Sequence, residues 1–172
     1  SSAASDVYKR QVVQMTLTTY DEYLCRKLEP NVSTTGERFE VLMRCKELGI
    51  PTLVWMTPIL PFINDTRENI EGLLDYCLQA GVQGILVFDV GVTLREGDRE
   101  YFYQALDRDF PGIRQKYVST YGNAYDIPSP HAKELMTLIQ NTCTANGLLC
   151  SPKECFTYLH EFPERYVQQT LF

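Results

Sequence analysis

The sequence lacks any apolar run of the roughly 18 to 20 residues that a bilayer-spanning helix requires. Its N-terminus also lacks the basic, apolar and small-residue order of a signal peptide. Of its 172 residues, 44% are hydrophobic and 22% are charged, which is typical of one soluble globular domain. These features predict a cytoplasmic protein without a membrane partner.

Basic residues are few: 16 Lys and Arg stand against 22 Asp and Glu, which gives a formal charge of −6. Non-specific attraction of nucleic acid needs clustered Lys and Arg to neutralise phosphates. The composition therefore argues against a general nucleic-acid-binding surface. A DNA substrate would need a local basic groove.

Several familiar catalytic motifs are missing. The sequence has no GxGxxG after a strand, no P-loop and no HExxH, and its two histidines are His131 and His160. Neither histidine accompanies a Ser or Cys in a sequence setting typical of a catalytic nucleophile. His131 follows Pro130 at a predicted helix start, where it is interpreted as a surface or capping residue. Hydrolase chemistry has little support.

The six cysteines form no recognised metal motif. The closest three, Cys143, Cys150 and Cys155, have spacings that match no common zinc or iron–sulfur pattern. Without a secretion signal, reduced thiols are expected rather than disulfides. Cys77 falls on an apolar helical stripe and is predicted to lie in the core.

Residues 1–11, SSAASDVYKRQ, are small and polar, then basic, without periodicity. The run is identical to a translation of the adapter used in transposase-based sequencing libraries, and strong patterning begins at Val12. Residues 1–11 are therefore interpreted as non-native, with a natural disordered N-terminus as the alternative. On this interpretation residues 12–172 are the C-terminal part of a protein that continued upstream of Val12.

Apolar patterning predicts strands that alternate with helices. The predicted strands cover residues 12–18, 51–57 and 84–90, and the last two are almost wholly apolar, as in parallel strands covered on both faces. Apolar residues spaced for a helix follow each strand. This order indicates right-handed crossovers and a parallel sheet with ligands at the C-terminal strand ends.

Capping and stop residues give the predicted helix boundaries. Thr34 with Glu37 forms a capping box, and Asp65 with Glu68 is expected to begin the next helix. Later helices are predicted after residue 98, ending before Pro111-Gly112, and over residues 132–143, and Ser151 with Glu154 could cap a last short helix. Turns, linkers or irregular structure are predicted over residues 19–33, 91–98 and 113–130.

Three parallel strands do not complete a sheet of this kind. A barrel needs more strands to close, and residues 12–18 would be an uncovered edge of the sort that proteins avoid. The fold class is therefore predicted to be α/β, with further strands upstream.

Candidate site residues lie at the three predicted strand ends. Alternation places Gln14, Thr16 and Thr18 on one face, so two hydroxyls could bind a sugar or a carboxylate. Alternatively, the threonines serve only as β-branched strand residues. Arg95 could clamp a carboxylate or be a solvated loop charge. The candidate segments are residues 16–21, 57–65 and 89–95.

Five short motifs occur in order: the run TLTT at residues 16–19, Leu28-Glu29-Pro30, a helix start from Thr34 to Arg38, Ile50-Pro51, and the loop PILPFIND at residues 58–65. In this order they resemble the second half of radical S-adenosylmethionine enzymes of the spore photoproduct lyase-like group. Phe62 stands where that group more often has Gly. The resemblance covers about residues 12–90, with looser similarity towards the C-terminus.

The resemblance implies a partial (β/α)6 barrel, of which this chain would supply the C-terminal half and its C-terminal helices. Family members hold a [4Fe-4S] cluster with a CxxxCxxC loop, and S-adenosylmethionine on the cluster supplies a 5′-deoxyadenosyl radical. By position, Thr16 and Thr18 would contact the ribose side of this cofactor. Pro58 and Pro61 would wall its adenine, and Arg95 could reach a carboxylate.

No CxxxCxxC occurs in the sequence, so the chain is either a truncated enzyme or a cluster-free relative. The adapter-like head favours truncation, and the chain alone is expected not to cleave S-adenosylmethionine. The substrate of the full enzyme could be DNA or a nucleotide. A barrel aldolase or a phosphate-sugar enzyme is the alternative enzyme class.

The last five residues suggest an alternative of another class. They resemble the QLxLF peptide by which bacterial proteins dock on the DNA sliding clamp, although an ordinary amphipathic terminus would also account for them. This motif would suit a DNA-repair lyase or a non-catalytic clamp-associated protein. Its residues are Gln168, Gln169, Thr170, Leu171 and Phe172.

Overall fold

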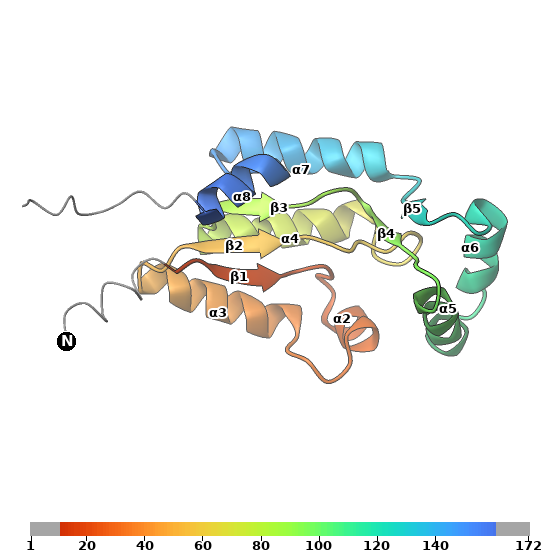
Figure 1. The fold of residues 1–172 in the computed structure, drawn as a ribbon. Helices are drawn as coiled ribbons and strands as arrows, with labels where there is room; N and C mark the ends of the chain where they lie inside the picture. Colours follow the sequence, from red (N-terminus) through yellow and green to blue (C-terminus); the bar gives the residue numbers. More distant parts are fainter. Residues whose placement is uncertain (1–10, 161–172) are drawn as a thin grey trace, which may run out of the picture.

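The centre of the protein is a parallel sheet of three strands, in the order β1 (Val13–Thr16), β2 (Thr52–Trp55) and β3 (Gly84–Leu86) (Figure 1). The structure is a computed structural model, and it describes residues 11–160. All three strands point the same way, with Val13 opposite Thr52 and Val54 opposite Ile85. The predicted α/β class with parallel strands is confirmed, whereas closure into a (β/α)6 barrel stays a prediction.

Three helices cover one face of this sheet: α3 (Thr35–Glu47), α4 (Arg67–Ala80) and α7 (Ala132–Asn146). Their apolar sides bury a common core with the strand residues that point to this face, such as Val54 and Ile85. Cys77 lies in this core with no exposed surface, as predicted. The Thr34–Glu37 capping box also forms as predicted and begins α3.

The opposite face of the sheet, termed the inner face, carries Gln14, Thr16, Leu53, Trp55 and Leu86. Helix α8 (Pro152–His160) packs on it through the fully buried Cys155. Helix α8 also reaches the carboxyl ends of two strands, since the Phe156 ring lies 6.2 Å from that of Trp55 at the end of β2 and 6.4 Å from that of Phe88 just after β3. On β1, Gln14 and Thr16 are exposed. Within residues 11–160, β1 pairs only with β2 and is an open edge.

A second lobe lies beyond the carboxyl ends of the strands (Figure 1). It pairs β4 (Gly91–Thr93) with β5 (Asp126–Pro128) antiparallel and adds α5 (Asp98–Asp109) and α6 (Ile113–Tyr121). Its own apolar core surrounds Tyr117. The predictions of a loop over residues 91–98 and irregular structure over 113–130 were therefore wrong. Three-residue strands leave no period-two pattern, and α6 begins after Gly112, without a side-chain cap.

Three further boundaries differ from the prediction. Helix α2 (Glu22–Leu28) occupies part of the predicted turn and linker, and Asp21 caps it by accepting a hydrogen bond from the Leu24 amide. Helix α4 begins after Thr66 rather than Asp65, because the Thr66 hydroxyl accepts the capping bond. Strand β3 ends at Leu86, four residues before the predicted end.

Two sequence hypotheses concern segments beyond the described residues. The sliding-clamp motif at residues 168–172 lies outside them, as does all of the adapter-like segment except Gln11. Among the helices that the structure describes, none has the length and apolarity that crossing a membrane requires.

Candidate functional site

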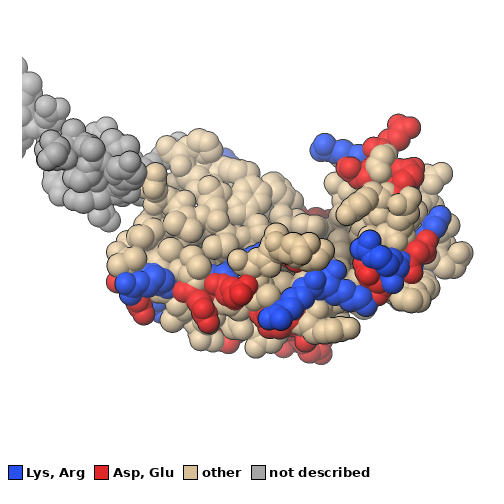
Figure 2. Space-filling model, turned by 90° about the horizontal axis from the view of Figure 1, so that it is seen from below, with Lys and Arg blue, Asp and Glu red and all other residues tan. Residues whose placement is uncertain are grey.

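An open groove of about 690 Å³ lies between the carboxyl ends of β2 and β3 and the second lobe. Figure 2 shows the lobe standing apart from the body of the protein across a notch. Parallel sheets place ligands at this end of their strands because the loops there converge. The groove therefore occupies the position that the sequence predicted for a site. Its lining residues are Thr57, Pro58, Phe88, Asp89, Gly91, Val92, Thr93, Asp126, Ile127 and Pro128.

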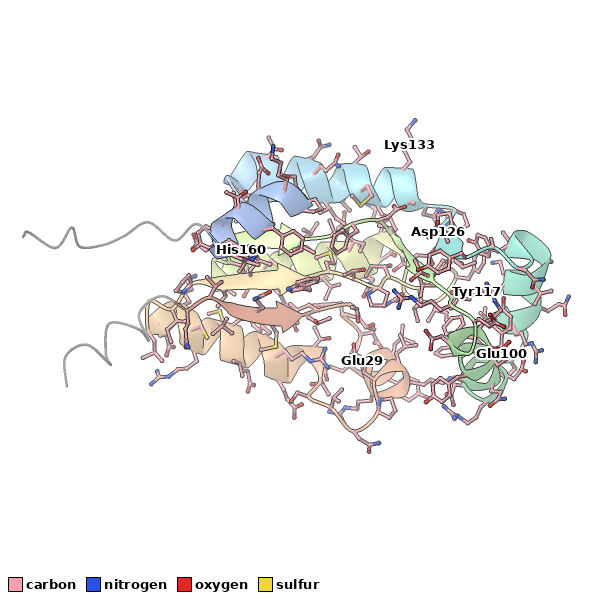
Figure 3. The ribbon with its side chains drawn as sticks, viewed as in Figure 1. Glu29, Glu100, Tyr117, Asp126, Lys133 and His160 are labelled. Atoms are coloured by element: carbon pink, nitrogen blue, oxygen red, sulfur yellow. The ribbon has the colours of Figure 1, made fainter. Side chains whose placement is uncertain are left out.

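Two carboxylates set the charge of the groove. Asp89 follows β3, and its Oδ1 atom accepts a 2.7 Å hydrogen bond from the Val90 amide, which orients the carboxylate. Asp126 comes from β5 and is exposed (Figure 3). The lining residues include no Lys, Arg or His. The groove therefore suits ligands with positive charge or hydroxyl donors and disfavours phosphate.

The loops around the groove are fixed by a buried amide network. The Thr18 carbonyl accepts hydrogen bonds from the side-chain amides of both Asn64 and Asn69, at 3.0 and 2.9 Å. Asn64 also donates to the Thr19 hydroxyl at 3.1 Å. Both asparagines are buried, so each lost bond would leave an unpaired polar group away from water. The network holds the end of β1 against the 58–65 loop and the start of α4.

An ion pair fixes the same strand end from the other side. Arg38 donates to Glu29 Oε2 at 2.6 Å and to the Thr16 carbonyl at 3.1 Å. Glu29 Oε1 accepts a 2.9 Å bond from the Thr18 hydroxyl. Figure 3 shows Glu29 beside the carboxyl end of β1. Three of the five recognised motifs thus meet in one hydrogen-bonded cluster that positions the backbone.

A third contact ties the 58–65 loop to α7. The Ser129 hydroxyl donates to Asp65 Oδ2 at 2.5 Å and accepts a bond from the His131 amide at 2.9 Å. His131 occupies the N-cap position of α7 and is exposed, but its side chain makes no capping bond. His160 lies at the end of α8, near the amino ends of the strands and remote from the groove (Figure 3).

The structure separates the predicted cofactor-contacting residues. Pro58 lines the groove, and Thr16 is exposed on the inner face at the end of β1. Thr18 is buried and bonded to Glu29, because regular strand alternation stops at Thr16. Alternation had predicted that Thr18 shares one face with Gln14. This prediction was wrong, because the Thr18 hydroxyl is buried.

The other two predicted residues lie outside the groove lining. Pro61 is buried, and its carbonyl accepts a 2.8 Å hydrogen bond from the Tyr117 hydroxyl. Desolvation raises the pKa of Tyr117 above its usual range, which keeps this donor protonated. Arg95 is exposed, and a hydrogen bond with Tyr125 raises its pKa.

The sequence analysis did not predict Phe88 or the three β5 residues Asp126, Ile127 and Pro128 as site residues. Phe88 lay within a predicted core strand, although 56% of its surface is exposed. Asp126 lay in a segment predicted to be irregular, and only the β4–β5 pairing brings it to the groove. No local pattern indicates either position.

All six cysteines are free thiols. Cys143 donates a hydrogen bond to Cys150, which lowers the pKa of the half-buried Cys150 and raises that of Cys143. Burial raises the pKa of Cys77 to about 12. Residues 11–160 bring together no group of three or more His, Cys, Asp or Glu that could hold a metal ion.

Comparison with known proteins identifies distant relatives. No family model matches the chain. The chain is 28% identical over 124 residues to uncharacterized proteins of Mycobacterium bovis and Mycobacterium tuberculosis, across 72% of this chain and 36% of theirs. It is 30% identical over 82 residues to an uncharacterized protein of Acidianus two-tailed virus, across 45% of this chain and 27% of that protein. The chain thus spans 36% of the length of its mycobacterial relatives.

Proposed function

We propose that this chain supplies the C-terminal half of a radical S-adenosylmethionine barrel, related to the spore photoproduct lyase-like group, and binds the adenosyl part of the cofactor at the groove. The main supporting observation is the groove itself, which opens at the carboxyl ends of parallel strands in a sheet whose β1 side chains Gln14 and Thr16 are exposed. Of the five motifs that resemble this group, the 58–65 loop contributes Pro58 to the lining of the groove. The greater length of the mycobacterial relatives leaves room for the other strands.

The open edge of β1 is a second support. Strand edges are usually paired or protected, because unpaired amides and carbonyls recruit other strands. The exposed Gln14 and Thr16 side chains are unusual for the middle of a parallel sheet, whose faces are normally covered. Both features are expected if further strands continue the sheet past β1.

The groove residues fit S-adenosylmethionine in chemistry. Asp89 can accept hydrogen bonds from ribose hydroxyls, and Pro58 offers a flat apolar wall. Thr16 is the exposed last residue of β1, and its hydroxyl would be the donor from that strand. Thr18 would act as a positioning residue through Glu29, and the exposed Arg95 could pair with the cofactor carboxylate.

The iron–sulfur cluster is not accommodated by the described residues, since they present no suitable set of ligands. Its thiolates would have to come from the rest of the full-length protein. In this family the bound cofactor supplies a carbon-centred radical for hydrogen abstraction. The part assigned to this chain is to bind, orient and shield the cofactor.

Binding of S-adenosylmethionine by the full-length protein tests this assignment. Thr16→Val removes the exposed hydroxyl but keeps the β-branched shape, and we expect it to weaken binding about fivefold or more. Thr137→Val, at an exposed position on α7, is the matched control and should bind normally. Calorimetry that shows no binding by the unmodified protein, or equal affinity for both variants, would remove the assignment.

A further inference from the structure

Three aromatic side chains gather on the inner face next to the groove. Trp55 lies 6.2 Å from both Phe88 and Phe156, and Phe88 lies 6.4 Å from Phe156, between ring centroids. They come from β2, the segment after β3, and α8. These centroid distances are within the range at which aromatic rings attract one another in protein cores.

Phe88 nevertheless differs from a core residue. It is 56% exposed, whereas Tyr117, the central aromatic residue of the second lobe, is fully buried. The ring packs against Trp55, whose indole N–H donates a 2.9 Å bond to Gln14. Phe88 therefore presents an aromatic surface to an open groove, as in sites that stack planar ligands.

The charge next to Phe88 restricts what could stack there. Asp89 is its neighbour in sequence, and Asp126 lies in the same groove lining. Aromatic faces attract cations, and the attraction grows when the cation loses contact with water. Two carboxylates and no basic side chain in the lining favour a cation further and repel phosphate.

We propose that Phe88, supported by Trp55 and Phe156, is the stacking platform for a planar, positively charged substrate ring that carries no phosphate at this site, with Asp126 as its counter-charge. Only the ligand's role as a substrate rests on the proposed function; the binding of a cationic ring does not. Phe88 and Asp126 line the same groove as Pro58 and Asp89, which the proposed function assigns to the cofactor, so the two ligands would be neighbours in one groove. Binding can be measured independently of catalysis.

The test uses three ligands that share one ring and differ in charge: 1-methylnicotinamide (cation), nicotinamide (neutral) and nicotinate (anion). Trp55 is the only tryptophan of the chain, so a single indole N–H resonance in the NMR spectrum reports on the platform. We expect a saturable shift with the cation, at least about tenfold weaker binding of nicotinamide, and no saturation with nicotinate. Equal behaviour of the three ligands, or no saturation with any, overturns the proposal.

Variants separate the platform from non-specific binding. Phe88→Leu keeps an apolar side chain but removes the aromatic face, and should weaken binding of the cation about fivefold or more. Asp126→Asn should reduce the preference for the cation over nicotinamide. Tyr101→Leu alters a comparably exposed ring on α5 and should change nothing. An unchanged affinity of Phe88→Leu, with its circular dichroism spectrum intact, also overturns the proposal.

A competition experiment distinguishes this inference from the proposed function. In the full-length protein, 1-methylnicotinamide should bind with S-adenosylmethionine already present. Displacement by the cofactor would assign the platform to the cofactor and overturn the substrate proposal. Binding of S-adenosylmethionine without any binding of the cation would overturn the platform and leave the proposed function standing.

Discussion

Arg38 and Glu29 form an ion pair of 2.6 Å whose side chains are only 11% and 27% exposed. The pair joins α3 to the segment after α2, and both partners also bond to the end of β1. Charged side chains with this little contact with water are costly unless they are paired. Their role is to fix the strand end that borders the candidate site.

Removing one partner should therefore destabilise the protein. We expect Arg38→Ala to lower the free energy of unfolding by about 1 to 3 kcal/mol, because Glu29 and the Thr16 carbonyl both lose a donor. Urea unfolding followed by circular dichroism measures this. Arg44→Ala is the matched control, since the exposed Arg44–Glu47 pair should contribute less than about 0.5 kcal/mol. Similar losses for both variants would contradict the role assigned to Arg38.

Asn64→Asp should also destabilise the fold. In the unmodified protein the Asn64 side-chain N–H donates to the Thr18 carbonyl. The substitution keeps the shape of the side chain but puts a carboxylate oxygen in place of this donor. We expect a loss of about 2 to 3 kcal/mol in thermal or urea unfolding at neutral pH. Asn146→Asp makes the same change at an exposed helix end and should cost less than about 1 kcal/mol. If Asn64→Asp unfolds like the parent protein, the network does not hold the loops.

Cys150 should be the most reactive thiol of the chain at neutral pH. The hydrogen bond from Cys143 favours its thiolate and lowers its pKa, whereas burial keeps the Cys77 thiol protonated, with a pKa of about 12. Alkylation by iodoacetamide, followed by peptide mass spectrometry across a pH series, should modify Cys150 first and Cys77 last. The midpoint for Cys150 should lie below the ordinary thiol value.

Substitution of Cys143 tests its role as the hydrogen-bond donor to Cys150. Cys143→Ala should move the reactivity midpoint of Cys150 to higher pH, and Cys143→Ser, which retains a hydroxyl donor, should move it less. The same midpoint in all three proteins would show that Cys143 does not set the pKa of Cys150.

The open edge of β1 predicts a pattern of hydrogen exchange. The amides of Val13 and Leu17 donate to carbonyls of β2 and its flanks, so the alternating amides of Gln14 and Thr16 face the open side. In this chain Gln14 and Thr16 should exchange fast. In the full-length protein a neighbouring strand should slow them by about a hundredfold or more. Fast exchange in both proteins would mean that no strand pairs there.

The sequence predicted the body of the fold better than the second lobe. The three strands and the capped helix at Thr34 follow from apolar runs and a capping box, which are local features. Strands β4 and β5 are three residues each and are defined by pairing between distant segments, which local patterns do not encode. Asp65 resembled a cap in sequence, yet Thr66 caps α4 because Asp65 is engaged by Ser129.

The candidate site was predicted in position but only partly in composition. Ligands of parallel sheets lie at the carboxyl ends of the strands, and this rule correctly placed Pro58 and Asp89 in the groove lining. Thr18 and Pro61 lie in the predicted candidate segments but do not line the groove. The Thr18 hydroxyl donates to Glu29, and the Pro61 carbonyl accepts a hydrogen bond from Tyr117. Phe88 and Asp126 could be found only from the tertiary arrangement of the inner face and the second lobe.

Production of 5′-deoxyadenosine is the most direct measurement of the central claim. The full-length protein would be reconstituted anaerobically with iron and sulfide, reduced, and supplied with S-adenosylmethionine, with residues 12–172 alone as the control. The account predicts cluster absorbance and 5′-deoxyadenosine from the full-length protein and neither from the control. A full-length protein that binds no cluster and forms no 5′-deoxyadenosine would contradict it.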